Sequence, residues 1–305
     1  MSELVALTGA TGFIGSTFLK ALTNSGTKVR ALSRKSRVSK DLVEWVSGDL
    51  NSPQSLAELI DGAQTIIHCA GTVRGKSEQE FLSVNMHGTA NLLAACKMKT
   101  TDVRFLLISS LAAREPELSW YAQSKFKAEQ MLKAQASNID YAIFRPTAVY
   151  GPGDKEIRPL LKAMKMGLLP VPNIKSQFSL LHINDLASAM LQWSSSHLPI
   201  TGIYELDDGM TNGYNWDSLV ELAKENWQRN VIKIPLPIDL LNMCATSNLA
   251  LARLINYSPM LTPGKIREIK HPSWVCDNTS LTKELGWEPT IKLADAMLNP
   301  ALLQL

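Results

Sequence analysis

Short apolar runs alternate with helical patterns through the first half of the chain. Six runs are predicted to be strands, at residues 4–8, 29–33, 42–47, 65–69, 103–108 and 141–144. Helical patterns lie between them, at residues 15–25, 52–60, 81–98 and 121–137. Alternation at this spacing is typical of βαβ units, so we predict an α/β fold with a parallel sheet covered by helices on both faces.

The pattern changes after Arg145-Pro146, where proline and glycine become frequent. Helical patterns recur at residues 157–166, 184–194, 215–226 and 240–254, but they no longer follow strands regularly. We therefore predict a sheet domain over residues 1–150, to which later segments return. A smaller, mainly substrate-binding lobe is predicted over residues 151–305, on the carboxyl-terminal edge of the sheet.

Composition and charge narrow the class of protein. The 305 residues are 45% hydrophobic, and 31 Lys and Arg balance 28 Asp and Glu without a dense basic block, which gives no sign of a nucleic-acid partner. The four cysteines are widely spaced, so neither disulfides nor a metal site is expected. With no leader pattern and no apolar run of membrane-spanning length, we expect a cytoplasmic protein without a membrane partner.

Three glycines directly follow the first predicted strand and open a helix. Gly9 permits a tight turn, Gly12 lets the backbone approach a pyrophosphate, and Gly15 lets the helix pack against the strand. A helix N-terminus also favours an anion. The turn predicts a dinucleotide site that includes Thr11, Phe13 and Ile14; the alternative is an ordinary strand-to-helix connection.

The residue after the second strand distinguishes the two nicotinamide cofactors. An acid there binds the ribose 2′-hydroxyl, whereas an arginine accommodates a 2′-phosphate. Residues 31–37 hold no acid and offer Arg34 first, so NADP(H) is preferred and NAD(H) stays open. The alternative is a solvated basic loop.

Two further strand ends lie at the same edge of the sheet. Asp49, followed by Leu50, could accept from an adenine amino group; its alternative role is that of an acid before a helix. Cys69, Ala70 and Gly71 are small enough to let the backbone lie against a cofactor; alone, they form a turn.

Hydroxyl and amine groups follow the fifth predicted strand. Tyr121 and Lys125 lie four apart on one helical face, and a nearby ammonium would lower the pKa of a tyrosine toward useful acid and base chemistry. Ser109 and Ser110 end the strand itself. All four are predicted to lie at the edge that carries the glycine turn, since ligands bind at the carboxyl ends of parallel strands. A helix-surface pair is the alternative.

These motifs together resemble a known superfamily. TGATGFIG (8–15), SVN (83–85), ISS (108–110), YAQSK (121–125) and RPTAVYGPGD (145–154) are similar to those of the extended, epimerase/dehydratase-like branch of the short-chain dehydrogenases/reductases. The similarity extends through nearly the whole chain, to LGWEP (285–289). It implies a Rossmann-type doubly wound parallel sheet with a C-terminal substrate lobe.

The resemblance also implies roles for individual residues. Tyr121 would exchange the proton, Lys125 would lower its pKa and hold the nicotinamide ribose, and Ser110 would orient the carbonyl. Asn85 would shape the cofactor site, although a cap or turn role is equally open. The positions implied to lie along the nicotinamide are Ser109, Pro146, Thr147 and Val149. We expect structural roles for His182 and Asp185.

Some residues depart from the family pattern. Leu111-Ala112-Ala113 stands where sugar-nucleotide dehydratases carry an acidic pair, which argues against a dehydratase. The short segment between Ser110 and Tyr121 puts a nucleotide sugar in doubt, and a dissociable NADPH suits net reduction.

Three functions stay open at this point. The first is an NADP(H)-dependent oxidoreductase acting on a small molecule through Tyr121, Lys125 and Ser110. The second is a nucleotide-sugar epimerase that uses the same residues, and the third is a non-catalytic NADP(H)-binding subunit. Arg74, Ser110 and Tyr121 are the candidate substrate contacts, and a homodimer is possible.

Overall fold

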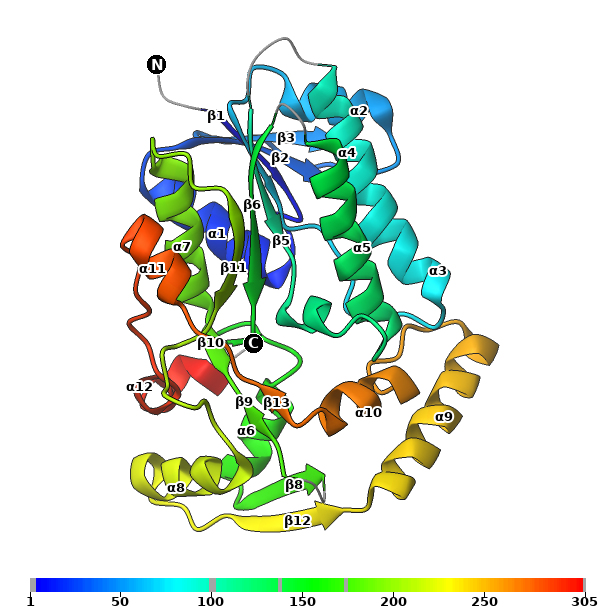
Figure 1. Ribbon diagram of the computed structural model, residues 1–305, viewed down its shortest axis with the longest axis vertical. Helices are drawn as coiled ribbons and strands as arrows, with labels where there is room; N and C mark the ends of the chain where they lie inside the picture. Colours follow the sequence, from blue (N-terminus) through cyan, green and yellow to red (C-terminus); the bar gives the residue numbers. More distant parts are fainter. Residues whose placement is uncertain (1–3, 99–102, 137–138, 173–174, 304–305) are drawn as a thin grey trace.

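A seven-stranded parallel sheet forms the centre of the upper part of the molecule (Figure 1). The computed structural model describes residues 4–98, 103–136, 139–172 and 175–303. The strands lie in the order β3, β2, β1, β4, β5, β6, β11. Their bounds are Leu4–Thr8 (β1), Lys28–Ser33 (β2), Val43–Ser47 (β3), Thr65–His68 (β4), Arg104–Ile108 (β5), Asp140–Pro146 (β6) and Gly202–Leu206 (β11). The predicted α/β class and six predicted strands are confirmed.

Helices cover both faces of the sheet. One face packs against α1 (Phe13–Asn24) and α7 (Ile183–Ser195), where Phe18 and Trp193 are fully buried. The other face packs against α2 (Pro53–Ile60), α4 (Gly88–Lys97) and α5 (Trp120–Gln135). Consecutive β1 residues enter opposite cores, which explains why the strands read as continuous apolar runs. This is the Rossmann-type doubly wound fold.

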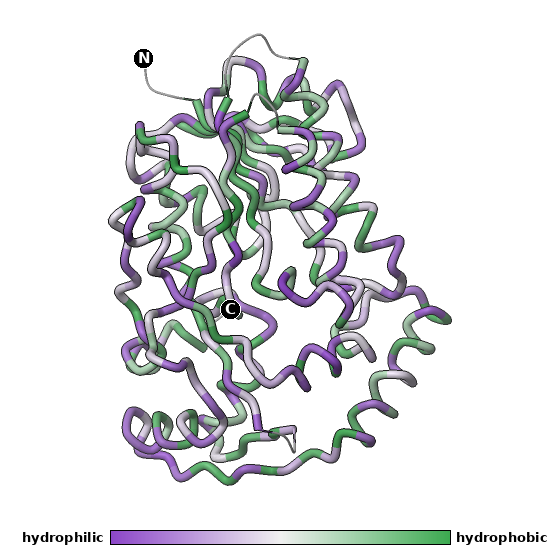
Figure 2. The backbone as a smooth tube through the Cα atoms, viewed as in Figure 1, coloured by the Kyte–Doolittle hydropathy of each residue, from purple (hydrophilic) through white to green (hydrophobic). Residues whose placement is uncertain are grey.

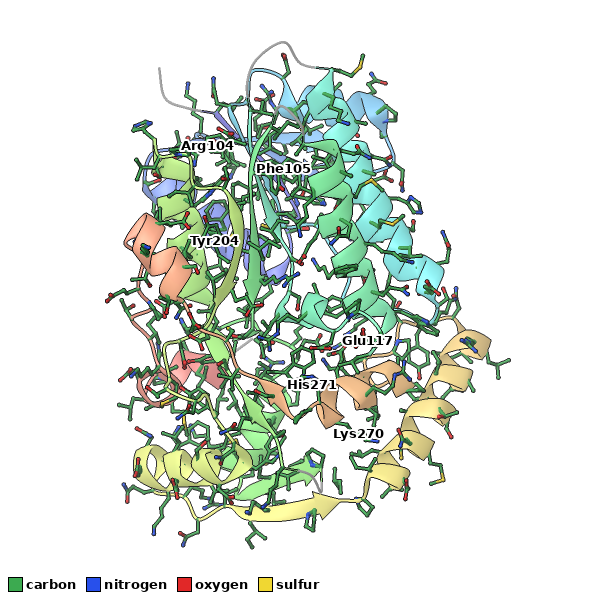
Figure 3. All side chains as sticks on the ribbon, viewed as in Figure 1. Arg104, Phe105, Glu117, Tyr204, Lys270 and His271 are labelled. Atoms are coloured by element: carbon green, nitrogen blue, oxygen red, sulfur yellow. The ribbon has the colours of Figure 1, made fainter. Side chains whose placement is uncertain are left out.

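The seventh strand, β11, comes from beyond residue 150 and was not predicted. It pairs with β6 and places Tyr204, which is labelled in Figure 3, against Phe144. The Tyr204 hydroxyl donates to Glu284 of α11 (Thr279–Leu285) at 2.5 Å. Helix α7 and strand β11 therefore belong to the sheet layer, and the domain division stays a prediction.

The predicted helix at residues 81–98 is interrupted. It consists of α3 (Glu78–Phe81), a π-helical turn at Leu82–His87 and α4. Asn85 lies in the π turn and is buried, with its amide bonded to the backbone of Thr72 and to the Ser124 hydroxyl. These bonds favour the wider turn because they hold Asn85 toward α5.

The remaining elements form a smaller lobe with its own core. Two-stranded parallel pairs join β7 to β10, β8 to β12 and β9 to β13. Their bounds are Ala148–Tyr150 (β7), Leu168–Pro172 (β8), Gln177–Phe178 (β9), Leu180–His182 (β10), Ile232–Leu236 (β12) and Ser273–Trp274 (β13). The helices are α6 (Arg158–Lys165), α8 (Trp216–Trp227), α9 (Ile238–Ile255), α10 (Pro263–Lys270) and α12 (Leu293–Met297). Short 3-10 turns lie at Leu111–Arg114 and Pro300–Leu303.

None of the helices in the described part of the chain combines the length and the apolarity needed to cross a membrane.

Candidate active site

The glycine turn adopts a conformation that only glycine allows at two of its positions. Gly9 has φ of +71°, and a Cβ there would lie 2.6 Å from the Ala70 nitrogen. A Cβ on Gly15 would lie 2.1 Å from the Gly9 carbonyl oxygen. Gly12 caps α1, and its amide donates to the Gly9 oxygen at 2.9 Å. The N-terminus of α1 is thus held against the end of β1, where the sheet order reverses between β1 and β4.

A cavity of about 1220 Å³ connects this turn to the smaller lobe. The predicted site residues that line it are Gly9, Thr11, Gly12, Phe13, Ile14, Gly15, Cys69, Gly71, Ser109, Ser110, Tyr121, Lys125, Pro146, Thr147 and Val149. The structure therefore brings the glycine turn, both serines, the tyrosine and the lysine to one cavity. The predicted residues outside its lining are Arg34, Asp49, Leu50, Ala70, Arg74 and Asn85.

Ser110 and Tyr121 both line the cavity, and the Ser110 side chain interacts favourably with the ionised form of Tyr121. Ser110 ends the strand segment and caps the 3-10 turn that follows, where its Oγ accepts from the Ala112 amide at 3.2 Å. Tyr121 lies in the first turn of α5, which Ser119 caps. The short 3-10 connection thus brings both side chains to the lining of the same cavity.

The ionisation of Tyr121 depends on its surroundings in the cavity wall. Burial raises the pKa of Tyr121 to about 12, the Ser110 hydrogen bond opposes that rise, and the charge of Glu268 adds to it. Burial dominates the pKa of Tyr121 in this structure, and the lowering expected from Lys125 stays a prediction. Tyr121 is therefore protonated at neutral pH and suited to donate a proton.

Lys125 is buried beside the end of β5. Its Nζ donates to the Ile108 carbonyl oxygen at 2.8 Å, and a Cβ on Gly71 would lie 3.2 Å from that Nζ. Burial lowers the pKa of Lys125 to about 8, while nearby Cys69 and Glu129 favour the charged form. A side chain at position 71 would therefore crowd the Lys125 ammonium.

Sequence reasoning missed a carboxylate in the cavity wall. Glu268 of α10 is 5% exposed and lines the cavity. It accepts from the Ser119 hydroxyl and, at 2.9 Å, from Lys265 Nζ. Close by, His271 lies 3.8 Å from Glu115, so the end of α10 rests against the loop before α5 (Figure 3).

A second missed carboxylate lies behind the serines. Glu129 of α5 has no exposed side-chain surface and accepts from the Ser109 hydroxyl at 2.5 Å. Arg145 donates two hydrogen bonds to the same carboxylate, at 2.9 and 2.6 Å. This buried ion pair fixes the end of β6 against α5, which supports the wall on which Ser109 lies.

Asn85 anchors the loop after β4 through hydrogen bonds to Thr72. Its amide accepts from the Thr72 nitrogen at 2.8 Å and donates to the Thr72 oxygen and to Ser124. Of the two expectations for this residue, the geometry matches shaping of the site wall, and Asn85 caps no helix.

Three predicted residues lie at the adenine side of the fold, beyond the cavity lining. Arg34 is exposed directly after β2, and no hydrogen bond or ion pair to another described residue engages it. The Asp49 carboxylate accepts from the Asn51 amide at 2.7 Å. Leu50 packs against the helical region around Gly88.

Ala70 and Arg74 lie in the loop after β4. The Ala70 amide donates to the Thr8 hydroxyl at 3.2 Å, which ties the loop to β1. Arg74 donates from Nε and Nη2 to Glu156 at 3.0 and 2.8 Å, so its guanidinium is engaged in an ion pair across the mouth of the cavity.

The expected structural roles of His182 and Asp185 match their contacts. His182 accepts from the Asn184 amide at the start of α7 and packs edge-on against Tyr150. Asp185 accepts from Thr290 and Ile291, which anchors the C-terminal segment.

The residues present fit a dinucleotide. The turn presents the N-terminus of α1 without side chains at Gly12 and Gly15, which suits a pyrophosphate. Thr147, at the other end of the cavity, has a buried Oγ1 without a hydrogen-bond partner among the described residues. A buried hydroxyl of this kind calls for a partner, and a cofactor lying along β6 and β7 would supply one.

The far wall of the cavity belongs to the smaller lobe and is mainly apolar. Its large side chains come from α6, β9, α8, α9, the segment between α9 and α10, α10 and β13. Among them are Leu160, Phe178, Trp216, Leu241, Leu249, Met260, Ile269 and Trp274. The cavity therefore joins the serine and tyrosine hydroxyls to a mainly apolar wall.

Fold and site together define a dinucleotide-binding α/β enzyme. Residues 5–199 match the family model described as "NAD dependent epimerase/dehydratase family", and the chain belongs to that family.

Similar proteins include both reductases and epimerases. Ceramide reductase of Caulobacter vibrioides is 36% identical over 278 residues, 89% of this chain and 85% of that protein. UDP-glucose 4-epimerase of Vibrio cholerae is 28% identical over 269 residues, 78% and 80% of the two chains. The structure of UDP-glucuronic acid 4-epimerase from Bacillus cereus, with UDP-glucuronic acid and NAD, superposes with a TM-score of 0.74 at 21% identity over 99% and 98% of the chains.

Proposed function

We propose that this chain is an NADP(H)-dependent oxidoreductase that reduces a carbonyl group on a substrate with a long apolar chain. The observation that carries the proposal is the single cavity in which the Ser110–Tyr121 pair meets the apolar wall of the smaller lobe. A mainly apolar wall beside the reaction centre suits a hydrocarbon chain on the substrate.

The chemistry requires a proton at the substrate oxygen. Tyr121, protonated at neutral pH, donates its hydroxyl proton to that oxygen, and Ser110 hydrogen-bonds to the same oxygen and orients it. When bound, NADPH supplies the hydride that reduces the carbonyl carbon. The carbonyl becomes an alcohol, and Tyr121 regains its proton from solvent.

The residues that would hold the cofactor lie along one path. The glycine turn would bind the pyrophosphate and Lys125 the nicotinamide ribose, while Pro146, Thr147 and Val149 would line the nicotinamide. Arg34 supports NADP(H) over NAD(H), because it is an exposed cation at the end of β2 with no acid beside it.

The substrate class also has support from a relative. Ceramide reductase covers most of this chain at 36% identity, and its name describes reduction of a lipid. A nucleotide-sugar epimerase is the second candidate, since UDP-glucose 4-epimerase is 28% identical over most of the chain.

The test compares two substrates and two tyrosines. The purified chain is mixed with NADPH and either a long-chain keto-amide lipid or UDP-glucose, and both cofactor oxidation and product are measured. We expect oxidation with the lipid only. Tyr121→Phe should lower kcat by about 10²–10⁴ while NADPH binding is retained, because it removes the proton donor. Tyr141→Phe, on β6 away from the cavity, is the matched control.

Two outcomes would reject this function. Conversion of UDP-glucose to its 4-epimer without consumption of NADPH would establish the epimerase instead. Full activity of Tyr121→Phe would remove the assigned proton donor.

A further inference from the structure

Helix α9 has a row of exposed apolar side chains. Leu240, Met243, Cys244, Leu251, Leu254 and Ile255 recur at helical spacing, and we call this row the outer face of α9. Leu254 is 82% exposed and Ile255 62%. Figure 1 shows α9 at the edge of the molecule, and Figure 2 shows green, hydrophobic stretches along it and along β12. Ile232 of β12 adds another exposed apolar side chain.

The opposite face of the same helix closes the cavity. Leu241 and Leu249 line the cavity, and Ala245 and Ala252 are buried. α9 is therefore a single-helix wall, with the substrate compartment on one side and the exposed row on the other. Single exposed aliphatic residues are ordinary on protein surfaces, but two groups of them on one side of a helix, separated by Thr246 and Ser247, favour a contact surface.

The charge around α9 is strongly one-sided. Residues 155–175 and 228–270, which form α6, β8, β12, α9 and α10, hold eleven Lys and Arg and three Asp and Glu. The rest of the chain holds twenty and twenty-five. Lys233 is paired with Asp217 of α8, and the acids of α8 lie at the far end of the β8–β12 pair from α9 (Figure 1). The segments that build this part of the lobe thus carry a net positive charge, and the loop bonded to the end of α9 through Lys76 adds Arg74 and Lys76 with Glu78 and Glu80.

We propose that the outer face of α9 docks on the surface of a bilayer that contains anionic lipids, with α9 lying on the membrane and not crossing it. Apolar side chains would enter the headgroup boundary, and the surrounding cations would attract the lipid phosphates. The inference deepens and rests on the proposed function: a long-chain substrate is held in a membrane, and α9 separates that membrane from the cavity by one helix. It revises the expectation of no membrane partner, which was drawn from spanning segments alone.

The experiment measures binding to vesicles without any substrate. The full chain is sedimented with sucrose-loaded vesicles of phosphatidylcholine with about one third phosphatidylglycerol, and with phosphatidylcholine alone. We expect binding to the anionic vesicles that weakens as salt screens the charges. The variant Leu251→Ser/Leu254→Ser/Ile255→Ser should bind on the order of 100-fold more weakly, because it removes three aliphatic side chains from the row.

A matched control separates the surface from general hydrophobicity. Leu198→Ser and Leu298→Ser change residues that are 59% and 65% exposed but lie outside α9, and this double variant should bind as the unchanged chain does. Thermal unfolding of all variants checks that each is folded.

The following outcomes would overturn either the docking proposal or the proposed function. Equal vesicle binding by the triple variant and the unchanged chain would overturn the proposal. The proposal would also be overturned if neither protein bound vesicles and the unchanged chain formed a dimer that the triple variant did not form. The outer face of α9 would then contact a second copy of this chain. Vesicle binding with no lipid reduction would support docking and overturn the proposed function. Reduction of detergent-dispersed lipid without vesicle binding would support the proposed function and overturn docking.

Discussion

Glu268 shows how a site residue can escape sequence reasoning. It lies in the segment Lys265–Lys270, whose alternating charges have the pattern of a solvated helix face. In the structure α10 turns that carboxylate inward, against Ser119 and beside Tyr121. Its position depends on how the lobe packs on α5, which no local pattern reports. Tyr121, Lys125 and Ser110 were predictable because motif and strand order coincide.

Glu268 should set the pH range of the reaction. Its negative charge raises the pKa of Tyr121, so Glu268→Gln should lower that pKa. Carbonyl reduction needs the protonated tyrosine. The rate of reduction should therefore begin to fall at a lower pH in the variant than in the unchanged chain. Alcohol oxidation needs the phenolate and should gain at neutral pH. Initial rates in both directions across pH measure the shift.

The exposed Glu117, labelled in Figure 3, is the control for that variant. Glu117→Gln should leave the pH profile unchanged. A Glu268→Gln profile that coincides with that of the unchanged chain would show that the carboxylate does not act on Tyr121.

Arg34 should discriminate between the cofactors. Arg34→Ser removes the cation proposed for the 2′-phosphate, and a charge-assisted hydrogen bond of about 1.5–3 kcal/mol predicts a KM for NADPH about 10–100 times higher. The KM for NADH should hardly change. Arg37→Ser is the comparison, because the Arg37 guanidinium lies 5.0 Å from the Trp45 ring centre and is engaged there. Equal effects on both cofactors would assign the 2′-phosphate elsewhere.

At the scale of elements, local pattern was enough where the chain alternates strand and helix. Five of the six strands from β1 to β6 have apolar residues buried on both faces, and the edge strand β3 buries only Val46. The sequence does not predict that β11 joins the main sheet. The β11 segment GIYEL and the β8 segment LLPVP are both short and apolar, so the pattern does not indicate which of them belongs to the sheet. β11 joins β6 through long-range packing of α7 on α1, whereas β8 pairs with β12 in the lobe.

The π turn at Leu82–His87 was hidden for a related reason. Its sequence is compatible with an uninterrupted helix, and the wider turn arises from the bonds that Asn85 makes to Thr72 and Ser124. Helix α1 also begins at Phe13, two residues before the predicted start, since Gly12 and not Gly15 is its cap. Caps and local irregularities are thus set by tertiary contacts.

At the scale of the whole molecule, two buried titratable groups have opposite effects on the pH dependence of the folding stability. His68 ends β4 within the sheet core, where its ring nitrogens bond to Thr8 at 2.7 Å and Thr89 at 3.0 Å. Burial lowers the pKa of His68 to about 3. Asp208 lies after β11, 1% exposed, and accepts from the Tyr214 hydroxyl at 2.5 Å. Burial raises the pKa of Asp208 to about 6.

These shifts give the folding stability two opposite pH slopes between pH 4 and 6. In this window His68 is protonated only when unfolded, with an ordinary pKa near 6.5, so its contribution falls as pH falls. Asp208 is protonated only when folded, against an ordinary pKa of about 3.9, so its contribution falls as pH rises. Each slope approaches about 1.4 kcal/mol per pH unit, and the two nearly cancel.

Replacing either group should therefore expose the slope of the other. Around pH 5, the unfolding free energy of His68→Gln should fall as pH rises, because only the pH dependence that comes from Asp208 remains. The slope should differ from that of the unchanged chain by about 1.4 kcal/mol per pH unit. Asp208→Asn should change the slope by the same amount in the opposite sense. Urea unfolding at pH 4.5, 5.0 and 5.5 measures both, with the exposed His87→Gln and Asp61→Asn as controls. Since the comparison uses slopes, the constant destabilisation that each substitution causes drops out. Parallel slopes in all five proteins would mean that neither group titrates differently in the folded and unfolded chains.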